Sequence, residues 1–425
     1  MVTHSPKHKR DLRRLIAIFA ALYFVQGTCE PTDGLISQPL RSMMIDAGTS
    51  PDEVAQFMAL VGLLWAIKPF YGLAVDLVPL FGMRRKAWMI LSTSLATIGL
   101  GWLALHPPEM TPGWALATVL VLPTFGVALG DVVTDALMVE TGQPLEATGT
   151  LQSAQWTASN FAGVAVGPLV GWLTANDMGQ WAFAVAAVLS AGSLLMAIFV
   201  IRDPPPPTDP PEPASLRGAL RASFSPRVLR AALFLFLVAF NPFAGLEYNR
   251  ITRELNLGEL HYGLAGSVFA IFAVIASAGY GWAAERFEIK RIAHVALGAS
   301  VLVTFGVMLV HDAWTNYTFQ VVSAIAWTSA LLVQLDVAAR LCPPRYAGTV
   351  FAFLMAVMNA TASFGEWVGG SVHTQLLPTM GHTGAYNALV AVSALATALA
   401  WAMVPMLARD HALAKHEEET AAPRA

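Results

Sequence analysis

The sequence predicts an all-α integral membrane protein whose twelve membrane-spanning helices form two pseudo-symmetric bundles of six. Of its 425 residues, 56% are hydrophobic and only 12% are charged, about half the charged share of a typical soluble domain. The apolar residues run in blocks of roughly 20, the length that a helix needs to cross a bilayer. A proline-rich segment divides these blocks six and six, and features of the first half recur in the second.

The first apolar run follows a basic segment, Lys7 to Arg14, and is longer than the core of a signal peptide, so we expect it to stay attached as the first span. The expected spans follow the apolar runs in order: 14–40, 53–75, 87–106, 114–139, 150–174, 181–201, 231–255, 262–284, 292–311, 315–339, 348–376 and 383–407.

Basic residues indicate the sidedness of these spans, because lysine and arginine accumulate in cytoplasmic loops. With twelve spans, 21 of the 25 Lys and Arg residues fall on one face. Both termini are therefore expected in the cytoplasm. The expected domains are a six-helix bundle over 1–201, a cytoplasmic proline-rich linker over 202–230, a second bundle over 231–407 and a cytoplasmic tail over 408–425. Runs of proline such as those in the linker favour extended conformations over helix.

The two halves share spaced features. Gly72 lies four residues before Asp76, which precedes the basic cluster Arg84 to Lys86, and Gly281 stands in the same relation to Glu285 and the pair Lys290 and Arg291. Span 5 opens with Gly149 and carries Asn160, while span 11 opens with Gly348 and carries Asn359, an offset of 199 at both positions. Repeated six-span halves are the arrangement of major facilitator transporters, whose substrate path lies between the halves.

Other function classes find little support. The two cysteines, Cys29 and Cys342, are too few for a disulfide framework and are read as core residues. The sequence has no zinc-type Cys/His cluster, nucleotide-binding glycine loop or nucleophile–base set, so we expect no enzyme, cofactor or metal. The net charge of −3 favours no nucleic acid partner.

Four segments of the first half narrow the resemblance. They are Tyr23–Gly27, Trp65 to Lys86, Asp131 to Glu140, and Leu151 to Trp156. In their order and amino-acid sequence these segments resemble the folate-biopterin transporter family of the major facilitator superfamily. The resemblance implies that fold and transport of a small solute, and it favours a bacterial inner membrane. The second half matches this family only through the segment from Asp336 to Asn359.

Charged side chains inside the spans are the candidate site, because a charge at the bilayer centre costs a few kcal/mol and needs a partner or a water-filled path. In span 1, Glu30 and Asp33 lie beside Pro31 and Gly34, which weaken the helix. Broken helices near the midplane are common places for transporter sites. Alternatively, both acids already lie near the outer surface.

Asp131 and Asp135 in span 4 are four residues apart and project from one face of a helix. Two carboxylates so close cannot both carry charge cheaply, so one is expected to hold a proton, as a proton-coupled carrier requires. A carboxylate can also accept two hydrogen bonds from the amino and ring N–H groups of a pterin. In the alternative interpretation, Asp135 and Glu140 form structural ion pairs with the Arg84 to Lys86 loop.

The second half offers further substrate- or proton-binding candidates. Arg250 could clamp a substrate carboxylate, unless Glu247 neutralises it, and both follow a helix break at Asn241-Pro242. Asp336 is expected either to bind or simply to pair with Arg340 one turn later. The remaining candidates are polar residues inside spans 5 and 11: Asn160, Asn359 and Glu366.

Six residues are expected to act in the inner gate by forming two-state contacts between the halves. They are Lys68, Asp76, Arg84, Arg85, Glu285 and Arg291. The function favoured by all these features is proton-coupled transport of a flat, folate- or pterin-like solute by alternating access, with protons and the lipid bilayer as the other partners. A carrier of another amphipathic metabolite or lipid, and a scaffold that does not transport, remain alternatives.

Overall fold

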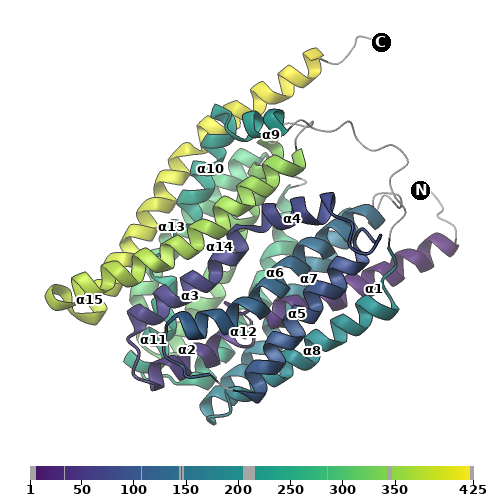
Figure 1. Ribbon diagram of the computed structural model, residues 1–425. Helices are drawn as coiled ribbons and strands as arrows, with labels where there is room; N and C mark the ends of the chain where they lie inside the picture. Colours follow the sequence, from purple (N-terminus) through teal and green to yellow (C-terminus); the bar gives the residue numbers. More distant parts are fainter. Residues whose placement is uncertain are drawn as a thin grey trace. The chain divides into compact units, whose positions relative to one another are not determined.

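The computed structural model describes residues 6–32, 34–106, 108–142, 145, 148–203, 216–284, 286–341 and 347–421. Within these ranges the chain is almost entirely helical (Figure 1). The helices are α1 (Pro6–Cys29), α2 (Ser37–Asp46), α3 (Pro51–Ala66), α4 (Lys68–Leu77), α5 (Lys86–Leu105), α6 (Trp114–Gly142), α7 (Thr148–Ala175), α8 (Gln180–Phe199), α9 (Leu216–Ser223), α10 (Pro226–Ala239), α11 (Ala244–Asn249), α12 (Glu259–Ala284), α13 (Ile289–Gly306), α14 (Ala313–Leu341) and α15 (Ala347–Ala421).

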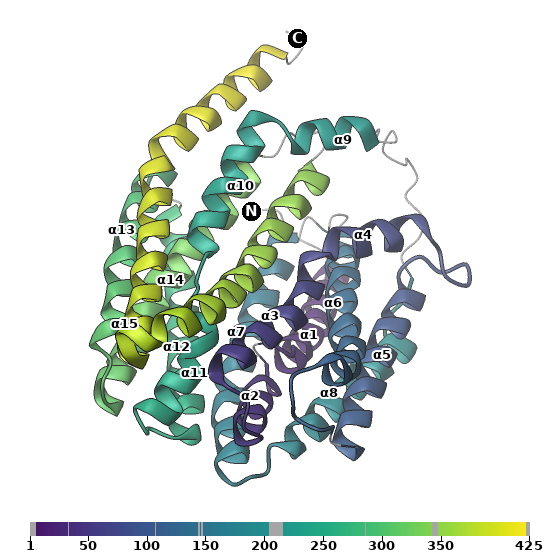
Figure 2. The same cartoon turned by 60° about the vertical axis from the view of Figure 1, so that its left-hand side comes forward.

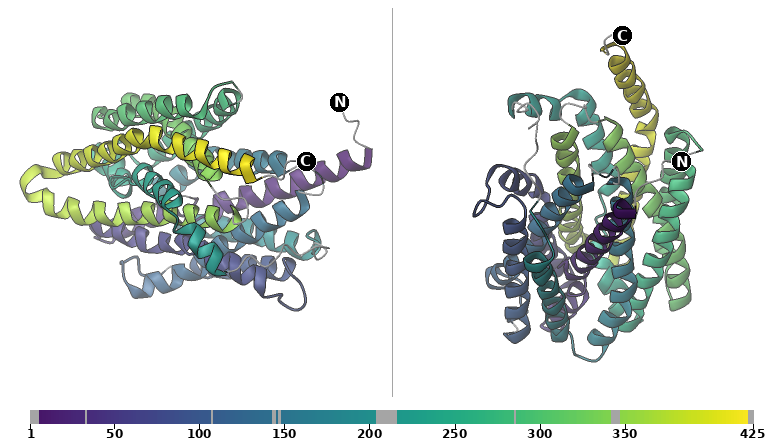
Figure 3. Two further views of the ribbon diagram at one scale, coloured as in Figure 1. Left: turned by 90° about the horizontal axis from the view of Figure 1, so that it is seen from above. Right: turned by 90° about the vertical axis from the view of Figure 1, so that its right-hand side faces the viewer.

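Ten helical segments of the described chain are long and apolar enough to cross a membrane. The last of them, Val350–Leu407, covers the two final expected spans, because α15 doubles back (Figure 3) at the non-helical residue Gly381. The expected span 150–174 corresponds to α7, which is not among the ten because polar residues such as Gln155 and Asn160 lower its hydropathy. The multi-pass helical architecture is as predicted.

Two of the expected spans are broken where the sequence indicated. Span 1 divides into α1 and α2 around Glu30 and Gly34. A Cβ on Gly34 would lie 2.4 Å from the Glu30 carbonyl oxygen, so only glycine fits this turn. Span 7 divides after α10 at Asn241, and the chain continues through α11 into a π-helix over Arg250–Glu254.

The described chain groups into two compact units. Unit 1 comprises Met1–Pro206 with Tyr248–Ile271, and unit 2 comprises Pro207–Glu247 with Phe272–Ala425. In unit 1, α5 packs along both α6 and α8, and α1 packs along α7. In unit 2, α15 packs against α10 and α13, and α13 against α14 (Figure 2).

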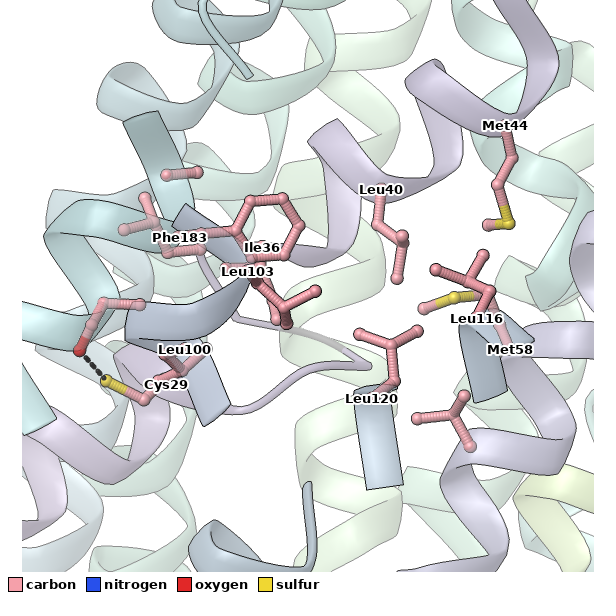
Figure 4. Close-up of a cluster of buried hydrophobic side chains, with 14 of the residues drawn as sticks. Cys29, Ile36, Leu40, Met44, Met58, Leu100, Leu103, Leu116, Leu120 and Phe183 are labelled. Carbon is pink, nitrogen blue, oxygen red and sulfur yellow. Dashed lines mark hydrogen bonds between the residues drawn. The ribbon is translucent and has the colours of Figure 1, made fainter. Parts of the chain in front are cut away.

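The core of unit 1 is filled by aliphatic, aromatic and sulfur-containing side chains (Figure 4). Leu100, Leu103 and Phe183 are fully buried around Cys29, whose Sγ lies 3.2 Å from the Ala186 carbonyl oxygen. Cys29 is thus a core residue, as expected; Cys342 lies outside the described residues. Unit 2 has its own core between α10, α13, α14 and α15.

Close helix packing positions α6, which carries the paired acids. A Cβ on Gly126 would lie 2.5 Å from the Ala96 backbone nitrogen and 2.7 Å from the Ser92 carbonyl oxygen of α5. Neither backbone atom can move without separating the two helices, so α5 and α6 are in direct backbone contact at this point.

We expect Gly126→Ala to lower stability by about 1–3 kcal/mol, the usual cost of overpacking. Gly101→Ala on α5 is the matched control, because nothing lies within 4 Å of its Cβ position. Thermal unfolding in detergent should show a lower Tm for Gly126→Ala only. Equal Tm values for the two variants would contradict the close contact.

Candidate functional site

Four helices of unit 1 bring polar side chains together around the middle of α6. Helices α1, α4 and α7 all contact α6. We call this group the α6 site and define it as Tyr23, Gln26, Lys68, Asp131, Asp135 and Gln155.

Lys68 and Asp131 form an ion pair in the α6 site. The distance from Lys68 Nζ to Asp131 Oδ2 is 2.6 Å, and the two side chains are 24% and 16% exposed. Lys68 Nζ also lies 4.2 Å from the ring centroid of Trp65, a position in which the aromatic face attracts the cation. Lys68 therefore contacts one of the paired acids directly and compensates its charge.

Asp135 is held by neutral donors. The Tyr23 hydroxyl donates a hydrogen bond to Asp135 Oδ1, and Gln155 Nε2 donates to the same oxygen at 3.4 Å. Among the described residues, no basic side chain lies within ion-pairing distance of Asp135. Tyr23 is only 1% exposed, so its hydroxyl is fixed in place.

The charges of the α6 site do not balance when both acids are ionised. Lys68 supplies one positive charge, whereas Asp131 and Asp135 together supply two negative ones. A proton on Asp135 would make the site neutral without disturbing the Lys68–Asp131 pair. The arrangement can therefore exist in two protonation states, and the difference lies at one carboxyl group.

A second ionic cluster lies between α4, the start of α5 and the end of α6. Arg85, 5% exposed, lies 2.6 Å from Glu140 and 2.7 Å from Asp76, and Arg84 lies 3.0 Å from Glu140. We call these four residues the Arg85 cluster. The structural interpretation of Glu140 is thus confirmed, whereas Asp135 belongs to the α6 site and does not join the loop.

Asp203, which was not predicted, caps the first turn of α5. Its carboxylate accepts hydrogen bonds from the backbone N–H groups of Arg84 at 2.8 Å, Arg85 at 2.7 Å and Lys86 at 2.9 Å. Lys86 is the first residue of α5, and its N–H is one of the donors that the start of a helix leaves without intrahelical partners; Arg84 and Arg85 directly precede it. Burial raises the pKa of Asp203, but the three N–H groups outweigh burial and hold its pKa below the ordinary value.

A third polar cluster joins α2 to the segment from Tyr248 to Glu259, all within unit 1. Arg253 lies 2.8 Å from Asp46 and 3.5 Å from Glu259. Glu259 also accepts hydrogen bonds from Gln38, Ser42 and Tyr248. We call this group the Arg253 cluster. It ties residues about 200 positions apart in sequence.

Two of the remaining candidates pair within their own helix. Asp336 pairs with Arg340 at 2.6 Å, as the simpler interpretation expected, and it also accepts a hydrogen bond from Tyr280. Arg250 pairs with Glu254 at 2.7 Å inside the π-helix.

The other candidates are not members of the three clusters defined above. Asn160 donates to the Trp156 carbonyl oxygen of its own helix. Glu30 accepts hydrogen bonds from the backbone and hydroxyl of Thr32, at the helix break. Arg291 is exposed; Glu247, Asn359 and Glu366 are half-buried in unit 2. Asp33 and Glu285 lie outside the described residues.

Sequence reasoning missed three residues of the α6 site and the Arg253 cluster. Tyr23 and Gln26 are three residues apart, so they share a helix face in an otherwise apolar span, and this spacing was a usable signal. Gln155 is another polar residue inside a span. The Arg253 cluster has no local signature, because its partners come from distant segments.

The fold is that of membrane transporters. The crystal structure of the nucleoside transporter NupG matches with a TM-score of 0.70 at 14% identity and covers 93% of this chain and 98% of its own. A bacterial homologue of the human lysosomal transporter Spinster matches with a TM-score of 0.64 at 16% identity, covering 97% and 98%. The predicted major facilitator fold is confirmed.

The chain belongs to the BT1 family, whose model matches residues 31–224 and 229–425. The folate-biopterin transporter of Synechocystis sp. is 28% identical over 382 residues, covering 84% of this chain and 74% of its own. Probable folate-biopterin transporter 4 of Arabidopsis thaliana is 23% identical over 434 residues, covering 84% and 87%. The resemblance drawn from the four segments is confirmed, and the protein is a multi-pass membrane transporter of this family.

We expect Asp203→Asn to lower the free energy of unfolding by about 0.3–1 kcal/mol at pH 7, because it removes a carboxylate charge at the start of α5 and replaces one acceptor oxygen with an amide nitrogen. Because the pKa of Asp203 is lowered in the folded state, its stabilisation is fully present above the unfolded value of about 3.9. It disappears as the pH falls through the folded-state pKa. Tm measured in detergent should differ between wild type and variant at pH 7 and 5, and converge below about pH 4. A difference that persists unchanged in acid would contradict the cap.

Proposed function

We propose that this transporter moves a folate- or pterin-like solute by alternating access, with protons as the coupling ion. The observation that carries the proposal is the charge arrangement of the α6 site, in which Lys68 compensates Asp131 and only neutral donors hold Asp135. The names of the Synechocystis and Arabidopsis relatives support the solute class.

In this mechanism Asp135 carries the proton. Protonation makes the site neutral. The change between access from one side of the membrane and access from the other then costs less electrostatic free energy than with an uncompensated charge in the site. Asp131 keeps its charge in both states because Lys68 stays beside it. The Tyr23 hydroxyl fixes the Asp135 carboxyl, so that loss and gain of the proton occur at a defined position.

Alternating access requires contacts that form in one state and break in the other. We propose that the Arg253 cluster provides such contacts on the non-cytoplasmic side. On the cytoplasmic side we assign this role to Asp76, Arg84 and Arg85, with Glu285 and Arg291 as their counterparts in the second half. With this assignment we propose that both termini lie in the cytoplasm and that the membrane is a bacterial inner membrane. Lys68, which we first expected in the gate, is assigned to the α6 site.

The proton role is tested with purified protein in liposomes and labelled folate or biopterin. Asp135→Asn, which mimics a permanently protonated acid, should lose accumulation driven by an inward proton gradient while retaining exchange of internal for external solute. Asp131→Asn should lose both activities, because it leaves Lys68 without its partner.

Asp312→Asn, at an exposed loop acid, is the matched control and should behave as wild type. Gradient-driven accumulation by Asp135→Asn would refute the coupling role. If the wild type takes up neither folate nor biopterin but does take up another amphipathic solute, the assigned solute class is wrong.

Asp76→Asn should slow turnover severalfold with little change in KM, because Asp76 pairs with Arg85 in the Arg85 cluster and is not a member of the α6 site. Arg85 keeps Glu140 as a partner at 2.6 Å, so the variant is expected to fold. Initial rates of uptake at several solute concentrations give both quantities. A large rise in KM with unchanged maximal rate would place Asp76 in solute binding and not in the gate.

A further inference from the structure

Two half-buried glutamine side chains in the α6 site have buried carbonyl oxygens without a hydrogen-bond partner. They are Oε1 of Gln26 on α1 and Oε1 of Gln155 on α7. A buried carbonyl left without a donor costs about 1–3 kcal/mol, so such atoms are rare in folded proteins and ask for an explanation.

The partners of the two amide groups fix which end is the oxygen. Gln26 Nε2 donates to Thr134 Oγ1 at 2.8 Å, and the Thr134 hydroxyl itself donates to the Gly130 carbonyl oxygen at 2.7 Å. Thr134 thus has only lone pairs to offer Gln26, which requires the amide nitrogen to face it. Gln155 Nε2 faces the Asp135 carboxyl, which likewise needs a donor.

Within the α6 site, the two polar atoms that are buried without any hydrogen-bond partner are both acceptors, the amide oxygens of Gln26 and Gln155. The Tyr23 hydroxyl is engaged with Asp135, and the Lys68 ammonium with Asp131 and the face of Trp65. The two amide oxygens accept no hydrogen bond, and each carboxylate has lone pairs beyond those engaged. A ligand that satisfies these atoms must therefore present several N–H donors.

We propose that Gln26 and Gln155 are specificity-determining residues that accept hydrogen bonds from the N–H edge of a planar heterocycle. The chemical class is a cyclic guanidine or amidine, such as the 2-amino and N3–H edge of a pterin. The inference rests on the proposed function, and it adds the residues that recognise the ring by hydrogen bonding. A solute of similar shape without these donors leaves both oxygens buried and unsatisfied, and is rejected for that reason.

The experiment compares two substrates in liposomes. One is biopterin, and the other is its 2-dimethylamino, N3-methyl analogue, which has the same ring but lacks the N–H donors of that edge. The wild type should prefer biopterin in kcat/KM. Gln26→Met and Gln155→Met keep the length of the side chain and remove the acceptor. Each should raise the KM for biopterin about tenfold to a hundredfold, with kcat nearly unchanged and little effect on the methylated analogue.

Gln334→Met in unit 2 is the matched control. Its carbonyl oxygen is also buried without a partner, and its Nε2 lies 3.4 Å from the Ala330 carbonyl oxygen of the same helix. This variant should keep the preference of the wild type. Binding of both compounds in detergent, measured by calorimetry, repeats the comparison for any variant that folds but does not transport.

The outcomes separate the two proposals. If the wild type prefers biopterin and both variants in the α6 site keep that preference, the role of the glutamines is refuted while the proposed function stands. If Gln334→Met loses the preference for biopterin as much as the two variants in the α6 site do, the role of Gln26 and Gln155 is also refuted. If the wild type neither binds nor transports either compound, the proposed solute class is refuted, and so is the recognition of its ring by the two glutamines.

Discussion

The cost of an uncompensated charge at membrane depth is the constraint on which the arrangement of unit 1 depends. Lys68 and Asp131 meet it by direct pairing at 2.6 Å. Asp135 meets it through hydrogen bonds from neutral donors, Tyr23 and Gln155. The close backbone contact of α5 and α6 and the packing of α1 and α7 hold these side chains in register. Helix packing thus fixes the positions of the few side chains whose charges must be compensated.

The acids of α6 differ in their ionic partners, and these differences suit similar residues to different roles. Glu140 is bound by two guanidinium groups and anchors a loop, because arginine stays charged under all ordinary conditions. Asp131 has a lysine and Asp135 has none. The three acids of α6 therefore differ in their cationic partners: Glu140 has two, Asp131 has one, and Asp135 has none within ion-pairing distance among the described residues.

The sequence allowed the fold to be predicted because hydropathy and helix periodicity are local properties. The helix breaks at Gly34 and Asn241, the shared face of Asp131 and Asp135, and the pairing of Asp336 with Arg340 all follow from spacings of a few residues. The Arg253 cluster and the contact of Tyr23 with Asp135 could not be predicted in this way. They join segments that only tertiary packing brings together, and Arg253 and Asp46 are 207 residues apart.

The cap that Asp203 forms on α5 gives the long linker a fixed point of attachment. The amides that it binds belong to Arg84, Arg85 and Lys86, and the side chains of the first two belong to the Arg85 cluster. The linker and the ionic cluster therefore share one anchor. A single carboxylate just after the end of α8 thus binds the backbone from which the side chains of the Arg85 cluster project.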